Sequence, residues 1–400
     1  LFWTDNRNQP RKINVTRQLG YYFMEEHVSV AKYYPYQPIN LYEKDQYQYY
    51  DSGGGLAVAS TMRDRSSKYL PDGVTLNPYG PDGKLEYVDW DGDEKFLKDK
   101  FVRFSYRFKF EDGEYSLMAP FTQIAFVPEQ DGYFISNDDK KDIDRTYKGT
   151  QVEFMVNKIN DITLMIPPPT NTSTSITETW ADAYNDFKIV EVDILYKQAN
   201  SLAVKIVDTI KKDTFVTASW EAGKLDPHFG WFKYNYTSQK PWKVLTDLEV
   251  TRVYDMVPVK ALTQEITGNR VIYGNFLDKH TPVKNLNYRV GAAEKGYTGT
   301  SGDPSDLIDA RESVIRKEYQ NHTLKQNRSY QVGIVFSDLY GRQSDVITSS
   351  GVDNSTVHHK YKESGFSEVL NTTGNLIGNG DTWAGDCLTV EFFESIPETI

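Results

Sequence analysis

A run of alternating aromatic and polar residues constrains the fold of this chain more than any other feature. In FVRFSYRFKFEDGEYSLMAPF, every second position of the first half is aromatic: Phe104, Tyr106, Phe108 and Phe110. The positions between them are polar: Ser105, Arg107 and Lys109. Because successive side chains of a β-strand point to opposite faces, this period of two predicts a strand with a buried aromatic face and a basic face in water. Glu111–Glu114 then supplies a hairpin turn, and Tyr115–Phe126 is the expected return strand.

A second hairpin near the other end of the chain has the same pattern. In SYQVGIVFSDLYGRQSDVITSS the alternating apolar positions are Tyr330, Val332, Ile334 and Phe336. In both stretches an Asp follows the last apolar residue by two positions, a Gly turns the chain and a Ser opens the return strand: Asp112, Gly113 and Ser116, then Asp338, Gly341 and Ser344. In this alignment the second turn is two residues longer. The match predicts that hairpins 101–126 and 329–349 occupy equivalent positions in two similar sandwich-like domains, although any two strong hairpins share such signals.

The composition extends this fold class to the whole chain. Aromatic residues make up 14% of the 400 residues, and short β-branched or aromatic runs lie between Gly, Asn, Asp and Pro. A turn signal follows about every ten residues, as in β-sandwiches. The length suggests two or three domains. We expect a mainly β protein with fibronectin- or Ig-like sandwich modules and few short helices, one at Thr179–Phe187 and one that begins at Asp303–Ser305.

The charge balance and the cysteine content exclude several classes of protein. The formal net charge is −11, whereas a general nucleic-acid-binding surface needs Lys and Arg to neutralise phosphates. The acidity can equally be a solubility feature. No apolar run approaches the 18 or so residues of a membrane-spanning helix. Cys387 is the only cysteine, so a disulfide within the chain and a cysteine zinc site are excluded.

Asn-x-Ser/Thr sequons leave the cellular compartment open. They stand at Asn14, Asn171, Asn235, Asn321, Asn327, Asn354 and Asn371. A secreted protein can carry glycans at such sites. However, a chain rich in Asn, Ser and Thr produces these triplets by chance, and secreted β modules are commonly stapled by disulfides.

The residues that could carry chemistry form no known constellation. The histidines are scattered: His27, His228, His280, His322, His358 and His359. The sequence has no zinc-protease motif, nucleophile elbow or phosphate loop, and we expect His358 and His359 to form a surface pair. Asp89, Asp91 and Asp93 suggest a calcium loop, but the full spacing is missing and ordinary Asp-Gly turns explain them. We therefore predict no catalytic, cofactor-binding or metal-binding residues, no cofactor and no enzyme activity.

A further strand-rich stretch is TDLEVTRVYDMVPVKALTQEITGNRVIYGNFLDKHTP. It places a turn at Asn269 and a strand with alternating Val271 and Tyr273 after it. We interpret Arg252 and Arg270 as partners of Asp or Glu in buried or interfacial ion pairs, because polar side chains held between strong strands need partners. The alternative is a solvated strand edge.

Several of these stretches together resemble large virion structural proteins of tailed bacteriophages, with the marine myovirus and crAss-like group as the nearest match. The stretches are LFWTDNRNQPRKIN, FVRFSYRFKFEDGEYSLMAPFTQIAFVP, GNRVIYGNF and YQVGIVFSDLYGRQS. The resemblance spans most of the chain and is weakest at 81–100 and after Ser350. It implies an assembly component of the neck or tail, with no catalytic residues to carry over.

The opening LFWTDN also resembles the YWTD repeat of β-propellers, with Phe2 in place of the Tyr. A propeller closes only with several blades. Leu1 is therefore expected inside a blade whose other strands precede it in a longer chain or come from Asn269–Phe276. The resulting division has propeller-like β segments at 1–60 and 251–300, a fibronectin-like sandwich region at 61–250, and a helix plus a second sandwich-like region at 301–400.

Together these features predict a non-enzymatic virion structural protein of the neck, tail or nozzle that packs in a symmetric ring around the DNA conduit. Its partners would be copies of itself and neighbouring virion proteins, with DNA passing without specific binding and no membrane contact. Two alternatives stay open. One is a tail-associated carbohydrate-binding or glycan-degrading protein, whose Trp and Tyr side chains would stack on sugars, and the other is a cell-surface adhesion protein.

Overall fold

The computed structural model divides the chain into two compact units. The described residues are 1–17, 24–41, 47–50, 56–59, 62–63, 93, 95–126, 156–157, 159–169, 179–218, 224–225, 230–251, 257–268, 270–281, 286–294, 324–325, 327–351, 354–359 and 386–393. Unit 1 comprises Leu1–Thr16, Ser29–Ala31 and Met256–Ile400, and unit 2 comprises Arg17–Val28 and Lys32–Asp255. Segments from the two ends of the chain therefore belong to one unit.

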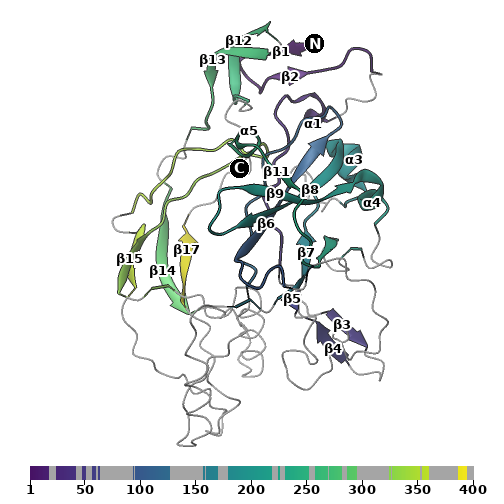
Figure 1. Cartoon of the computed structure of the whole chain (residues 1–400). Helices are drawn as coiled ribbons and strands as arrows, with labels where there is room; N and C mark the ends of the chain where they lie inside the picture. The colour runs from purple at the N-terminus through teal and green to yellow at the C-terminus, as the bar shows by residue number, and fades with distance from the viewer. Residues whose placement is uncertain are drawn as a thin grey trace, which may run out of the picture. The chain divides into compact units, whose positions relative to one another are not determined.

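Both units are built of antiparallel strands, so the predicted mainly β class is confirmed (Figure 1). The helices among the described residues are short: α1 (Glu25–Val28), α3 (Asp182–Phe187), α4 (Lys212–Val216) and α5 (Asp247–Thr251). The predicted helix at 179–187 is confirmed by α3, which ends where Lys188 adopts the left-handed conformation at φ 59°. The helix predicted to begin at Asp303–Ser305 lies outside the described residues.

Unit 2 contains a four-stranded antiparallel sheet in the order β11-β9-β8-β6. Its strands are β6 (Val102–Phe110), β8 (Ile189–Gln198), β9 (Val204–Lys211) and β11 (Lys243–Val244). As predicted, the aromatic residues of β6 are buried, with at most 3% of their surface exposed. The register places Phe104 opposite Tyr196, so large side chains of neighbouring strands pack against each other.

A three-stranded sheet in the order β10-β7-β5 packs against this sheet. Its strands are β5 (Met62–Arg63), β7 (Asp161–Ile166) and β10 (Phe232–Tyr236), and unit 2 also has the pair β3 (Tyr47–Tyr50) and β4 (Leu56–Ala59). The ring centroids of Phe104 in β6 and Tyr236 in β10 are 5.0 Å apart. Every residue of β7 is buried. The two sheets thus enclose an aromatic core, as the layers of a β-sandwich do.

The predicted solvated basic face of β6 is wrong. Ser105 and Arg107 are buried, and Lys109 is half-buried. The segment after the hairpin turn covers this face. The ring centroid of Tyr115 lies 4.0 Å from the Arg107 guanidinium carbon, and Ser105 Oγ donates a hydrogen bond of 2.7 Å to the Ala119 carbonyl. β6 is therefore packed on both faces.

This return segment is not the regular strand that the sequence predicts. Every third residue donates its N–H to every second carbonyl of β6, in the pairs Ser116–Phe108, Ala119–Tyr106, Thr122–Phe104 and Ala125–Val102, all at 2.8 Å. The same four donor residues are the buried ones. Two residues of a β-strand advance about 6.6 Å. Three residues of the return segment cover the same distance, so each of them advances about 2.2 Å. The segment is wound more tightly than a strand, with a side-chain period of three.

The second hairpin repeats the first one 228 positions later. The matching N–H to C=O bonds are Gly113–Phe110 and Gly341–Asp338, Ser116–Phe108 and Ser344–Phe336, and Ala119–Tyr106 and Ile347–Ile334. Both turn glycines have positive φ, 84° and 77°, where a side chain would be strained. Both Ser hydroxyls accept the N–H of the facing Phe and donate to the carbonyl of the next residue.

The structure confirms the repeat of the hairpin but corrects its alignment. Phe108 corresponds to Phe336, and Phe110 corresponds to Asp338. The prediction aligned Asp112 with Asp338 and made the second turn longer, whereas the two turns have the same length. The similarity of the whole domains around the two hairpins stays a prediction.

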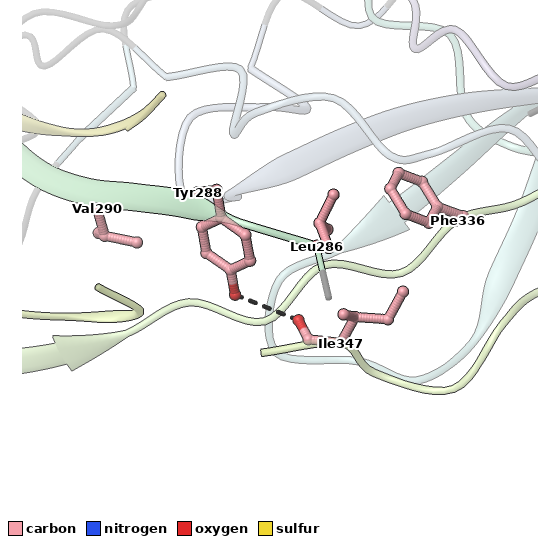
Figure 2. Close-up of a cluster of buried hydrophobic side chains, with 5 residues drawn as sticks. All are labelled: Leu286, Tyr288, Val290, Phe336 and Ile347. Atoms are coloured by element: carbon pink, nitrogen blue, oxygen red, sulfur yellow. Dashed lines mark hydrogen bonds between the residues drawn. The ribbon is translucent and has the colours of Figure 1, made fainter. Parts of the chain in front are cut away.

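The described residues of unit 1 contain four strand pairs. They are β1 (Phe2–Trp3) with β2 (Arg11–Lys12), β12 (Lys260–Thr267) with β13 (Arg270–Leu277), β14 (Tyr288–Glu294) with β17 (Asp386–Phe392), and β15 (Arg328–Gln331) with β16 (Thr356–His359). Figure 2 shows a small core of this unit, made of Leu286, Tyr288, Val290, Phe336 and Ile347. The Tyr288 hydroxyl lies 2.7 Å from the Val332 carbonyl and 3.2 Å from the Ile347 carbonyl, and its single proton is shared between these two acceptors. This core joins β14 to the second hairpin.

Candidate functional site

The most unusual surface of the described residues is the strand pair β12–β13, which we call the arm (residues 260–277). Large apolar side chains are exposed along both of its strands: Leu262 (49%), Ile266 (58%), Ile272 (52%), Phe276 (55%) and Leu277 (38%). The arm forms a two-stranded sheet of its own. The register places Ile272 and Phe276 on one face of the arm and Leu262, Ile266 and Leu277 on the other. Single exposed apolar residues are ordinary, but a group of them on each face of an uncovered strand pair marks an interaction surface.

The opening segment of the chain holds one side of the arm. The Thr4 hydroxyl and the Asn6 N–H both donate to the Ala261 carbonyl, at 2.6 and 3.1 Å. Figure 1 shows β1 beside β12 accordingly. The opening residues of the predicted segment 1–60 and the arm, which lies in the predicted segment 251–300, therefore meet in unit 1, whereas Arg17–Val28 and the residues from Lys32 onward belong to unit 2. Their propeller character stays a prediction.

A tight polar turn presents Thr4 and Asn6 to the arm. The Asp5 carboxylate accepts the N–H groups of Arg7 and Asn8, both at 2.8 Å, and the Asn8 side chain at 2.7 Å. The backbone N–H of Asn8 is the largest of the causes that lower the pKa of Asp5 to about 2. Asp5 is therefore ionised at neutral pH and keeps the turn closed.

A polar cluster on the second hairpin holds both ends of the arm. Arg342 Nη1 donates to the Pro258 carbonyl, just before β12, at 3.0 Å. After β13, His280 Nε2 lies 2.8 Å from Asp338 Oδ2. Lys279 Nζ lies 2.6 Å from Asp345 Oδ1. The arm is thus mounted on the turn of the second hairpin.

The carboxylate of Asp338 is the centre of this cluster. Its Oδ2 atom accepts a hydrogen bond from Arg342 Nε at 2.7 Å and forms an ion pair with Arg342 Nη2 at 2.6 Å. Burial alone would raise the pKa of Asp338, but the charge of Arg342 and the hydrogen bonds from His280 and Arg342 outweigh it and lower the pKa. The cluster is an ion pair with a histidine beside it, which favours a positioning role.

The first hairpin carries a different polar cluster, which is buried in unit 2. Arg107 Nε donates to Asp193 Oδ2 at 2.9 Å, and Thr209 Oγ1 donates to Asp193 Oδ1 at 2.7 Å. Arg107 Nη2 also reaches Glu249 Oε1 at 3.4 Å. Arg107, Asp193 and Thr209 are register partners across β6, β8 and β9. The charges of this cluster are paired inside a sheet, which favours a structural role for the cluster.

The histidines singled out in the sequence lie apart where the structure describes them. His27 Nε2 lies 2.7 Å from the Asp186 carbonyl, and burial lowers the pKa of this imidazole. His358 Nδ1 lies 3.0 Å from Ser329 Oγ. His359 is buried, so the predicted surface pair is wrong for His359. His228 and His322 lie outside the described residues.

Asp93 is the described member of the predicted calcium loop, and Asp89 and Asp91 lie outside the described residues. The Asp93 carboxylate accepts the Lys95 N–H at 3.1 Å and pairs with Lys240 Nζ at 3.3 Å. Within the described residues, no group of three or more His, Cys, Asp or Glu side chains could hold a metal ion.

Arg270 is exposed on β13, so the expected burial of its ion pair is wrong, and an interfacial pair stays a prediction. Arg252 lies outside the described residues. Cys387 lies on β17 opposite Ala293. Sequence reasoning missed the cluster of Asp338 and Arg342, although their i,i+4 spacing beside a turn is a usable signal.

Comparison with protein-family models, with curated proteins and with solved structures finds no match to this chain. In the parts of the chain that the structure describes, none of the helices combines the length and the apolar character that crossing a bilayer requires.

Proposed function

We propose that this chain is a non-enzymatic structural subunit of a tailed-phage virion, in the neck or tail, which packs with copies of itself and with neighbouring virion proteins around the DNA conduit. The observation that carries the proposal is the arm. It exposes Ile272 and Phe276 by more than half, yet it is fixed at both ends by the second hairpin. A firmly mounted apolar strand pair suits permanent subunit contacts.

The charge of the chain is compatible with a conduit. DNA in transit is a polyanion, and a wall rich in Lys and Arg would bind it by releasing counterions. A net charge of −11 suits a wall that DNA slides past. The clusters around Arg107 and Arg342 support the same role, because both arginines are engaged within the protein.

Electron microscopy of the purified chain tests this proposal. We expect closed rings with a central channel, alone or after addition of the neighbouring virion proteins. Mass spectrometry of purified virions should then detect the chain as a component of the particle. A chain that is absent from virions, or that forms isolated fibres on their outer surface, would contradict the proposal.

A glycan-binding role is the second candidate, and one observation favours it. Trp242, which precedes the edge strand β11, is 66% exposed, and Lys243 follows it. An exposed indole can stack on a sugar ring. A glycan array combined with a reducing-sugar assay separates binding and hydrolysis from a purely structural role, and a Trp242→Ala variant would remove any signal that depends on this side chain.

A further inference from the structure

We propose that β13 pairs in antiparallel fashion with β13 of a second copy of this chain, about a two-fold axis at Gly274. The product is a four-stranded sheet with the order β12-β13-β13-β12. This inference goes beyond the proposed function because it names the strand, the register and the partner, and it requires only two copies of the chain.

The open edge of the arm is that of β13. β13 pairs with β12 from Arg270 to Leu277 except at Asn275, and within the described residues no strand pairs with its other edge. The outer side of β12 is already contacted, because the Ala261 carbonyl accepts Thr4 and Asn6. An unpaired strand edge is a template for another strand.

Charge complementarity selects the occupant and the register. With the axis at Gly274, Arg270 lies opposite Asp278 of the partner subunit, and Ile272 lies opposite Phe276 of the partner subunit. Two-fold symmetry makes each contact twice. Arg270 and Asp278 are exposed in the single chain, so both charges are available. A second copy supplies the opposite charge and the apolar partner at the required spacing.

Neighbouring registers lack this match. In a symmetric antiparallel pair, partners share a face, so the neighbouring registers have the axis at Tyr273 or at Asn275. With the axis at Asn275, Ile272 lies opposite Asp278 of the partner subunit. With the axis at Tyr273, Arg270 lies opposite Phe276 of the partner subunit. In the proposed register Asn275, the positive-φ residue of β13 at 48°, lies opposite Tyr273 of the partner subunit.

The pairing also answers a stability problem of the arm. An isolated two-stranded hairpin is marginally stable in water, and three or more strands with an apolar face are needed for independent stability. Ile272 and Phe276 lie on the same face of β13, because even-numbered positions share a face. In the dimer, the two copies of this pair form one apolar stripe across the new strand boundary.

Sedimentation equilibrium of charge variants tests the register. Arg270→Glu puts an acidic side chain opposite Asp278 of the partner subunit, and Asp278→Arg puts a basic side chain opposite Arg270 of the partner subunit. We expect each variant alone to raise the dimer dissociation constant about tenfold. An equal mixture of the two variants restores both opposite-charge pairs, so it should form heterodimers as tightly as the wild-type chain forms homodimers.

Ile272→Asp removes the apolar stripe and should leave the chain monomeric at concentrations where the wild type is dimeric. Leu202→Asp is the matched control, because Leu202 is 89% exposed on unit 2 and should leave the dimer intact. Unchanged circular dichroism shows that each variant is folded. A monomeric wild type, single charge variants that still dimerise like the wild type, or a mixture without recovery would overturn the inference. None of these outcomes depends on whether the chain belongs to a virion.

Discussion

The β6 hairpin and the arm are both antiparallel pairings of an extended chain, and they differ in what covers them. β6 is packed on both faces, and its edges are occupied by β8 and by the return segment. The arm has exposed apolar side chains on both strands, and its β13 edge has no strand partner among the described residues. The first therefore stabilises its own unit, whereas the second has bonding capacity left for another chain.

The difference lies in the third segment that accompanies each pair. The return segment brings a small buried residue to β6 at every third position, which lets the two backbones stay close. In the described part of the chain, the arm is accompanied by the short opening segment, which reaches it at Ala261, and is held at its ends by the second hairpin. Substitutions should therefore have different effects in the two regions. In β6 they should mainly lower the stability of the fold, and in the arm they should mainly weaken association.

The largest effect on stability is expected for Phe108→Ala. Phe108 is fully buried and contacts Tyr106 and Trp180 at ring-centroid distances of 5.4 and 6.4 Å. Its truncation should lower the free energy of unfolding by about 3–5 kcal/mol. Phe276→Ala in the arm is the matched control and should cost below about 1 kcal/mol in the monomer. Urea denaturation of both variants measures the contrast, and equal losses would end the comparison.

Arg107→Met should cost about 3 kcal/mol, because it leaves the buried carboxylate of Asp193 without its ion partner. Adding Asp193→Leu removes the stranded charge and should recover most of the loss, although the Thr209 hydroxyl then loses its acceptor. Thermal and chemical denaturation of the single and double variants check this. A double variant that is less stable than Arg107→Met would show that the cluster acts as more than a charge pair.

Asp338→Asn tests the mount of the arm and should cost about 1–2 kcal/mol at neutral pH. The pKa of Asp338 is lowered in the folded protein, so ionised Asp338 contributes stability above the ordinary Asp pKa of about 3.9. That contribution is lost as the pH falls through the lowered pKa. The difference in stability between wild type and variant should therefore shrink toward strongly acidic pH, and a difference that is independent of pH would contradict the assignment.

The smallest effects compare the two copies of the hairpin. Ser116→Ala and Ser344→Ala each remove an acceptor for the N–H of the facing Phe and should each cost about 1 kcal/mol. The backbone bond that the Ser N–H donates survives in both variants. Equal losses of stability in the two variants support the equivalence of residues 228 positions apart. A loss confined to one copy would show that the two hairpins share a geometry but not the energetic role of the Ser.

The sequence predicts the aromatic face of β6 because strand periodicity depends on local order alone. It does not predict the burial of Arg107, because Asp193 is 86 positions away and the return segment has a period of three instead of two. The sequence does contain a signal for the period of three, because small residues recur at every third position: Ser116, Ala119, Thr122 and Ala125.

The alignment of the two hairpins failed for a related reason. The sequence alignment pairs Asp112 with Asp338 because both are aspartates. In the structure the equivalent residues are Phe110 and Asp338, because the carbonyl of each accepts the N–H of the turn glycine. The contact of Thr4 with Ala261 spans 257 positions and has no local signal. The charges of the arm, Arg270 and Asp278, were visible in the sequence, but their exposure was not.

Hydrogen exchange of the arm at two protein concentrations tests the central claim most directly. The amides of β6 should exchange slowly at both concentrations, because their protection comes from within unit 2. The amides of β13 should exchange faster at the concentration where the chain is monomeric and slow down where it is dimeric, and Arg270→Glu should remove that slowing. Exchange of β13 that does not change with concentration, or that is as slow as that of β6 in the monomer, would contradict the account.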